Sequence, residues 1–239
     1  MTYRPISAVS EFNDLGILIQ FPDYPGAYAR GVNEAEALAK TTAELTSYAL
    51  WAGIEPPAAQ GVTVTARVRA SGDLRIDDAD SEILLDADNL RLPRGDFTRW
   101  QELALRSACC VQRLYDNISD KNWAQPDKQK KTFYGKTPST AREMYSHIEQ
   151  VCEYYLSRLS IYGSFNSGNL IDNRRICAEL LDKNYSVPFR IYHADGEYWT
   201  ETKVLRRFLW HDRIHAKAMF RHALKSGMRA EEIDNAFGF

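Results

Sequence analysis

The sequence predicts an α+β protein built from two parts. In residues 1–92, short apolar segments surround one helical stretch, whereas residues 96–226 contain four stretches with apolar residues at three- and four-residue spacing. A turn-rich junction, Leu92-Pro93-Arg94-Gly95, separates the two parts. We therefore expect a small α+β domain over residues 1–92 and an up-down four-helix bundle, with a C-terminal tail, over residues 96–239.

The first part begins with short strands and a capped helix. Asn33 is a suitable side-chain cap, with Glu36 three residues later as in a capping box, and Gly53 ends the helix. Residues 62–68 alternate apolar and polar side chains, as in a half-buried strand. The expected elements are strands at residues 16–21, 27–31, 62–68 and 83–85 and a helix between Asn33 and Gly53.

The second part reads as four helices with polar connections. Asp96 is the expected cap of the first helix, and Thr137, followed by Pro138, is the expected cap of the second. The third helix is expected over residues 169–183, and the fourth begins after Thr200 and ends near Gly227. Residues 185–199 are expected to form a loop or a small hairpin.

The composition excludes membrane-spanning and disulfide-rich proteins. Of the 239 residues, 44% are hydrophobic and 26% are charged, the usual balance of a globular chain. No apolar run approaches the roughly 20 residues of a membrane helix, and the first residues lack the layout of a signal peptide. The four cysteines form no CxxC pair. We expect reduced thiols, a cytoplasmic location and no membrane partner.

The formal net charge of −2 averages two unlike parts. Residues 1–95 hold 8 basic and 14 acidic residues, a net charge of −6, and the remainder holds 22 basic and 18 acidic residues, a net charge of +4. Neither value indicates the strongly basic face that nucleic-acid binding usually needs. No nucleic-acid partner is expected.

Histidine is scarce, and its five positions are informative. His211 and His215 are four residues apart in the fourth helix, so one lies a turn above the other on the same face. Val204 and Phe208 precede them on the same side, which places the HxxxH pair on the inward stripe. Two imidazoles at this spacing can chelate one metal ion.

A third ligand is needed, and His147 is the candidate. It lies in the second helix at the edge of the apolar stripe. His222 also falls near the inward face of the fourth helix but is two turns from His215, too far for the same ion. His193 lies in the loop, where it is either a lid residue or ordinary surface.

Residues 96–226 resemble the DinB/YfiT-like helical bundle superfamily. The resemblance rests on Thr137-Pro138-Ser139-Thr140-Ala141-Arg142-Glu143-Met144-Tyr145-Ser146-His147-Ile148 and on Gly196-Glu197-Tyr198-Trp199-Thr200, which leads into residues 204–215. It implies that His147 in the second helix and the pair His211 and His215 in the fourth bind one divalent metal ion. Asp212 stands where many members have glutamate. Bundles of this kind often form homodimers.

Residues 13–70 resemble HicB-like antitoxin domains. The carrying segments are Phe21-Pro22-Asp23-Tyr24-Pro25-Gly26, Gly31 with Glu34-Ala35-Glu36-Ala37, and Gly53-Ile54-Glu55-Pro56-Pro57. The resemblance implies a small sheet with a helix packed on it. The usual DNA-binding tail of an antitoxin is absent from this sequence, and the helical part takes its place.

Three imidazole ligands leave coordination positions open, which is typical of a catalytic rather than a structural site. A divalent ion there lowers the pKa of a bound water or thiol and makes it a nucleophile at neutral pH. Zinc, nickel, iron and manganese all suit three histidines. The resemblance adds a small thiol cosubstrate, since characterised relatives include thiol-dependent transferases and isomerases.

Three functions are open at this point. The first is a metal-dependent enzyme of thiol-transferase or hydrolase type, with no catalytic side chain assigned. The second is a non-catalytic stress-linked or regulatory binding protein, and the third is a toxin–antitoxin-related component. The histidine triad favours the first two.

Several neighbours of the triad are candidates for supporting roles. Asp212 points about 100° away from His211 around the helix, so a surface ion pair is expected for it. Three arginines either hold an anionic thiol cosubstrate or lie on solvated helix faces: Arg142, Arg206 and Arg207. Two aromatic residues are expected in the core, Tyr145 and Trp210.

Overall fold

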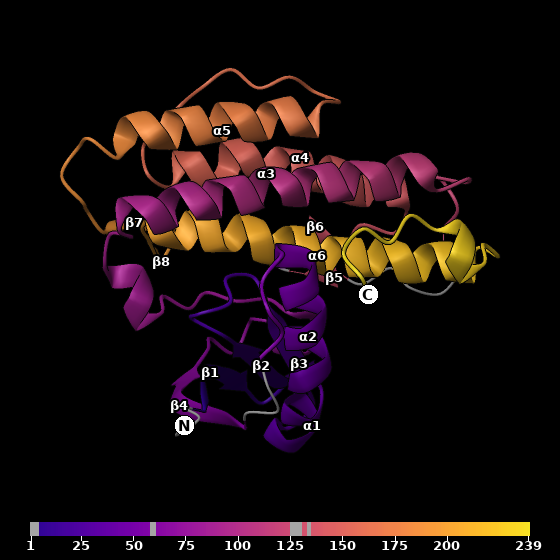
Figure 1. Ribbon diagram of the computed structural model, residues 1–239, viewed down its shortest axis with the longest axis horizontal. Helices are drawn as coiled ribbons and strands as arrows, with labels where there is room; N and C mark the ends of the chain where they lie inside the picture. The colour runs from indigo at the N-terminus through magenta and orange to yellow at the C-terminus, as the bar shows by residue number, and fades with distance from the viewer. Residues whose placement is uncertain (1–4, 58–60, 125–130, 133–134) are drawn as a thin grey trace. The chain divides into compact units, whose positions relative to one another are not determined.

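The chain folds as an α+β protein with a four-stranded mixed sheet and six α-helices among the residues that the structure describes (Figure 1). The structure is a computed structural model and describes residues 5–57, 61–124, 131–132 and 135–239. The chain divides into two compact units, a sheet unit that ends at Ala87 and a helical unit from Asp88 to Phe237. The predicted α+β class is confirmed.

The sheet unit has the strand order β3-β2-β1-β4. β1 and β2 form an antiparallel hairpin, β3 pairs antiparallel with β2, and β4 runs parallel to β1 at the other edge. The connection from β3 to β4 crosses the sheet through two helices. These elements are β1 Ile6–Asn13, β2 Gly16–Gln20, β3 Tyr28–Gly31, α1 Glu34–Ala39, α2 Thr41–Ala52 and β4 Val62–Arg69.

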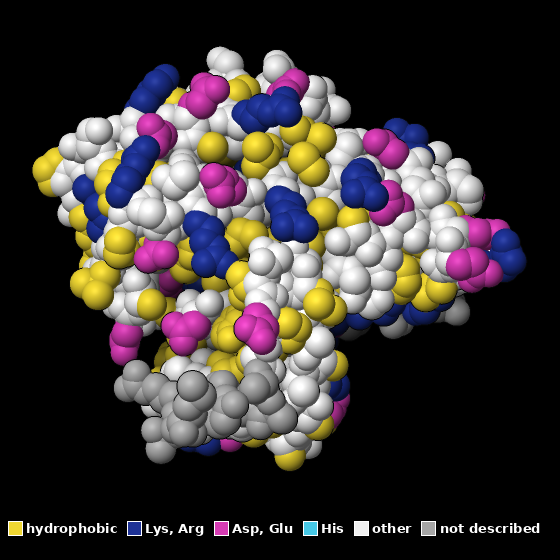
Figure 2. Space-filling model, viewed as in Figure 1, with side chains coloured by type: hydrophobic (Ala, Val, Ile, Leu, Met, Phe, Trp, Pro, Cys, Tyr) yellow, Lys and Arg dark blue, Asp and Glu magenta, His cyan; other side chains and the backbone are white. Residues whose placement is uncertain are grey.

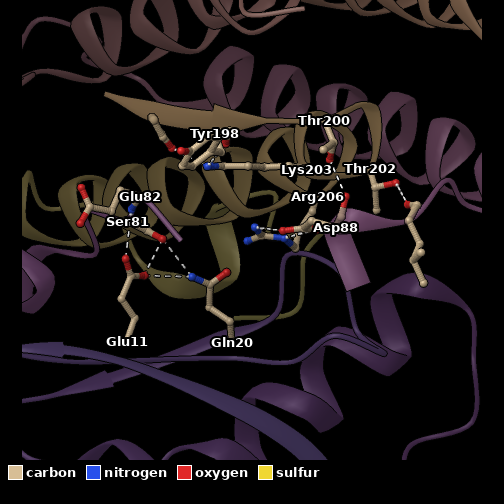
Figure 3. Close-up of polar contacts among 12 residues, drawn as sticks. Glu11, Gln20, Ser81, Glu82, Asp88, Tyr198, Thr200, Thr202, Lys203 and Arg206 are labelled. Atoms are coloured by element: carbon tan, nitrogen blue, oxygen red, sulfur yellow. Dashed lines mark hydrogen bonds and ion pairs between the residues drawn. The ribbon is translucent and has the colours of Figure 1, made fainter. Parts of the chain in front are cut away.

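β1 is absent from the predicted strands because its burial does not alternate. Ser10 and Glu11 are both fully buried, so the period of two that marks a half-buried strand is missing. One carboxylate oxygen of Glu11 accepts hydrogen bonds from the Ser81 hydroxyl at 2.6 Å and from the Gln20 side-chain amide at 3.2 Å (Figure 3). Its other oxygen accepts from the Glu82 N–H at 3.0 Å. These bonds hold the segment after β4 on the sheet.

The strand predicted at residues 83–85 does not form. Ile83 and Leu85 instead pack with Val9 in a small buried cluster. Two short 3₁₀ helices lie on either side, η1 Ile76–Asp78 and η2 Asp86–Asn89. The apolar residues of this segment therefore indicate burial correctly but not strand pairing.

The structure has two helices, α1 and α2, where the sequence predicts one helix between Asn33 and Gly53. The Asn33 side chain accepts a hydrogen bond from the Glu36 N–H at 2.9 Å, so the predicted cap is confirmed. The break lies at Lys40, whose N–H donates to the carbonyl oxygen of Ala37 at 3.2 Å. Gly53 ends α2 in the left-handed conformation with φ 69°, where glycine carries no steric penalty.

The helical unit contains four long helices that lie side by side (Figure 1). α3 packs against α5 and α6, and α4 also packs against α5 and α6. The core helix α6 is buried at every position from 201 to 213. The helices are α3 Arg94–Asn117, α4 Ala141–Ser157, α5 Leu170–Asn184 and α6 Glu201–Lys225, followed by the short η3 Ala230–Glu232.

The starts of these helices correct two of the predicted caps. α3 begins two residues before Asp96, which therefore lies in the first turn, where its carboxylate favours the helix dipole. α4 is capped by Thr140, whose hydroxyl accepts from the Glu143 N–H at 3.1 Å, and not by Thr137. α6 begins directly after Thr200 as predicted, and the Thr200 side chain is its cap.

Two short hairpins occur in the helical unit. The segment predicted as a loop or small hairpin forms one, and its turn consists of Asp195 with φ 53° and Gly196 with φ 81°. The hairpins are β5 Lys131–Thr132 with β6 Gly135–Lys136, and β7 Tyr192–Ala194 with β8 Glu197–Trp199.

Candidate metal centre

Three imidazoles from two helices meet inside the helical unit. The ring centroid of His147 on α4 lies 4.9 Å from that of His211 and 4.9 Å from that of His215, both on α6. The two α6 rings are 4.3 Å apart. One nitrogen from each ring can be chosen so that all three lie within 4.8 Å of one another. The structure thus brings together the three histidines that the sequence singles out.

The spacing of apolar residues explains this convergence. His211 and His215 occupy successive turns of α6, and Val204 and Phe208 on the same stripe are fully buried. α4 packs against α6, so a residue on the facing side of α4 reaches this stripe. His147 lies there, with ring edges of both α6 histidines against it.

Burial keeps the three rings uncharged at neutral pH. Burial lowers the pKa of His215 to about 3, with a further contribution from His147. Burial, together with the neighbouring imidazoles and two arginines, holds the pKa of His211 well below its ordinary value. Burial also lowers the pKa of His147. Neutral imidazole is the form that binds a metal ion, so the site needs no deprotonation before loading.

One nitrogen of the triad has no partner in the described chain. Nδ1 of His211 is buried and accepts or donates no hydrogen bond among the described residues. A buried polar atom without a partner costs about 1–3 kcal/mol. A bound cation would remove this cost, and three neutral nitrogen donors are a ligand set that zinc, nickel, iron and manganese accept. The residues present therefore fit a divalent metal ion.

The other two histidines are engaged elsewhere. Nε2 of His222 lies 2.6 Å from the carbonyl oxygen of Trp123, and the two rings make an edge contact. The ring of His193, on β7, packs on that of Tyr198 on β8. Neither joins the triad, as expected from the sequence for His222.

Asp212 is a correction to the surface ion pair that the sequence suggests. It is fully buried and forms a bidentate ion pair with Arg174 of α5, with N–O distances of 3.0 Å and 3.1 Å. Burial raises the pKa of the Asp212 carboxyl, and Arg174 opposes that rise. Arg174 is absent from the predicted candidates because nothing in the α5 sequence marks this arginine as inward-facing.

Two of the candidate arginines are engaged away from the triad. Arg142 is exposed and donates to the Asn122 side chain at 2.8 Å. Arg206 forms a buried ion pair with Asp88, with an Nε–Oδ1 distance of 3.1 Å (Figure 3). Neither presents a guanidinium to an anionic cosubstrate in this structure.

Arg207, the third candidate arginine, is close enough to His211 to contribute to the lowered pKa of that ring. Its guanidinium carbon lies 4.5 Å from the ring centroid of Trp210 and 5.6 Å from that of Tyr155. The Tyr155 ring in turn makes an edge contact with His211 at 6.1 Å. Trp210 and Tyr145 are buried, as predicted for core residues.

The surface drawn in Figure 2 carries both signs of charge. Basic and acidic side chains are interspersed over the helices on this face, with no extended patch of one sign. No described helix is both long enough and apolar enough to cross a membrane. Comparisons with protein-family models, with curated proteins and with solved structures gave no match for the chain.

Proposed function

We propose that the chain is a divalent-metal-dependent enzyme of thiol-transferase or hydrolase type, with a DinB/YfiT-like bundle as its metal-binding unit. The observation that carries this proposal is the meeting of His147, His211 and His215, each of which offers one nitrogen within 4.8 Å of the other two. Three of the five histidines in 239 residues converge at one point of the fold.

The role of the three side chains follows from their burial. As neutral nitrogen donors they hold one divalent ion and leave coordination positions for a further ligand. When bound, the ion supplies Lewis-acid activation of a water or thiol at neutral pH. His211 is 7% exposed, whereas His147 and His215 are half-buried, so the triad is not fully enclosed.

The sheet unit supports the proposed likeness to HicB-like domains. Its three antiparallel strands, helical crossover and returning fourth strand form a small sheet with helices beside it. We assign to it a folding or dimerisation role. The four unpaired cysteines agree with a reducing, cytoplasmic setting.

A non-catalytic metal-binding protein is the second candidate. Proton transfer needs a general acid or base near the reacting group. Asp212, the acid next to His211, is fully engaged by Arg174 and does not serve that role. This observation favours metal binding without turnover.

Metal analysis of the purified protein tests the proposal. After incubation with Zn²⁺ and dialysis, we expect about one ion per chain, a large loss of the ion in His147→Ala, and no loss in His193→Ala, whose ring lies outside the triad. Circular dichroism of each variant checks that the fold is kept. A wild-type protein without stoichiometric metal would overturn the proposal.

A thiol-transfer screen separates the enzyme from the binding protein. The loaded protein is mixed with an electrophilic acceptor and bacillithiol, mycothiol or glutathione. Turnover that disappears in His147→Ala supports the enzyme. A protein that holds its ion but turns over neither these thiols nor simple ester and amide substrates is the non-catalytic candidate.

A further inference from the structure

A buried ion pair lies next to the triad in the helical unit. The side chains of Arg174 on α5 and Asp212 on α6 are 2% and 0% exposed, and their two N–O contacts are 3.0 Å and 3.1 Å. Asp212 directly follows His211 in the sequence. The pair therefore joins α5 to the helix that carries two of the three imidazoles.

Arg174 contacts two successive turns of α6. Its guanidinium carbon lies 4.1 Å from the ring centroid of Phe208, four residues before Asp212. At 100° per residue, Phe208 and Asp212 lie 40° apart around the helix axis, so both are on the same side of α6. A guanidinium fixed to both residues leaves α6 little freedom to rotate about its axis.

Apolar burial is one-sided only in the second half of α6, where Ala216, Met219 and Ala223 are fully buried between half-buried and exposed neighbours. Every residue of α6 from 201 to 213 is buried, and the set includes charged side chains on all sides of the helix. The first half of the helix therefore lacks a single apolar stripe that distinguishes its inward face. A directional contact beside His211 adds to the apolar packing of the second half in defining which face meets α4.

The ion pair is a poor source of stability. Taking two charges out of water costs several kcal/mol per ion, and a buried pair recovers this only when its remaining polar atoms are satisfied. Nε of Arg174 has no hydrogen-bond partner among the described residues. Geometric specificity is the best-attested benefit of such pairs.

We infer that Arg174 and Asp212 are positioning residues for the metal site, which set the rotation of α6 so that His211 and His215 face His147. The inference rests on the proposed metal function and adds that the affinity of the site is controlled from α5.

The test replaces the whole pair by apolar residues of similar size, Arg174→Met with Asp212→Leu, because such replacement often preserves or raises stability. The matched control is Arg206→Met with Asp88→Leu, which removes the buried pair that joins α6 to η2, whose side chains are 3% and 1% exposed. Each protein is titrated with Co²⁺, and its visible absorption spectrum is recorded. Nuclear Overhauser contacts between the imidazole ring protons are measured without metal.

We expect Co²⁺ to bind at least about tenfold more weakly to the Arg174/Asp212 variant, with an altered spectrum and weakened contacts between the rings of His147 and His211. The control should keep its affinity within about twofold of wild type. Affinity, spectrum and ring contacts like those of wild type in the first variant would overturn the inference. If wild type binds no Co²⁺, the proposed function fails, and the ring contacts alone decide whether the pair positions the histidines.

Discussion

At the scale of single residues, burial sets the protonation of the site. His211 is buried and His215 is half-buried, neither has a carboxylate ion pair among the described residues, and each ring disfavours charge on the next. The same environment that keeps the rings ready for metal makes the metal-free protein sensitive to acid.

The metal-free protein should lose stability below about pH 6.5. The pKa of His215 is lowered to about 3 in the folded state and is about 6.5 in the unfolded state. Between these values the unfolded state binds more protons, so the free energy of unfolding falls as pH decreases. In His215→Gln this slope should be smaller by about 1.4 kcal/mol per pH unit, measured by urea unfolding at about pH 4 to 6. Equal pH dependence of the free energy of unfolding in wild type and His215→Gln would contradict the lowered pKa of His215.

Lys203 should make the free energy of unfolding depend on pH in the alkaline range. It is fully buried, and burial lowers its pKa to about 8, although Glu197 at 2.7 Å opposes the shift. Between about pH 8 and 10.4 the unfolded state binds more protons than the folded state, so this residue destabilises the fold increasingly as pH falls through that window. The stability of wild type relative to Lys203→Met should rise by ~3 kcal/mol from pH 8 to 10.4. A constant difference in denaturant unfolding would contradict this.

The sequence singles out the three candidate ligands but not the residues that surround them. HxxxH spacing places His211 and His215 on one face, which any helix ensures. Arg174 and Asp212 could not be paired from the sequence, because they are far apart in the chain and charged residues are rarely buried. The prediction of a surface ion pair for Asp212 follows that general rule and is wrong here for that reason.

At the scale of elements, apolar periodicity predicts that a helix or strand exists better than it predicts where the element begins and ends. The fourth helix and its start after Thr200 are confirmed, because a long periodic stretch marks the helix. The cap of α4 is displaced from Thr137 to Thr140, since both residues satisfy the same sequence rule and only packing chooses between them. β1 is missed because buried Glu11 resembles a surface residue in the sequence.

The Thr140 cap gives a direct test of the start of α4. Thr140→Ala leaves the Glu143 N–H without its side-chain acceptor, so the free energy of unfolding should fall by about 1 kcal/mol. Thr140→Ser keeps the hydroxyl and should remain within a few tenths of a kcal/mol of wild type. Both are measured by urea unfolding followed by helical circular dichroism. Equal losses in the two variants would show that the hydroxyl is not the cap.

Glu11 should be the most sensitive polar position of β1. Glu11→Ala removes the acceptor for three hydrogen bonds in a fully buried place, which should cost at least about 3 kcal/mol. The control is Glu34→Ala, which breaks a half-exposed ion pair with Arg67 and should cost less than about 1 kcal/mol. Similar losses in guanidinium unfolding would contradict the role of Glu11 in holding the segment after β4.

At the scale of the whole molecule, the sheet unit and the helical unit each have a core of their own. Leu18 and Ile19 are fully buried in the first, and Phe208 and Leu209 in the second. All three candidate ligands belong to the helical unit. Metal binding should therefore act on one unit.

Hydrogen exchange should localise the response to metal. Zn²⁺ at 100 times its dissociation constant stabilises the folded form by ~2.7 kcal/mol, because only the folded site binds it. We expect slower exchange in peptides from α4 and α6 and no change in those from β1, β2 and β3. Mass spectrometry with and without Zn²⁺ measures this, and His147→Ala should show no difference. Equal slowing in both units would show that they unfold together.

The positions of the three histidines along the chain have a topological consequence. His147 precedes α5 and the β7–β8 hairpin, whereas His211 and His215 follow them. An ion bound by these side chains would link α4 to α6. It would close the backbone between them into a loop, as a cross-link does. Since the entropy of closing a loop grows only slowly with its length, insertions between the two helices should cost little. The bound ion would hold α4 and α6 together even where the sequence between them changes.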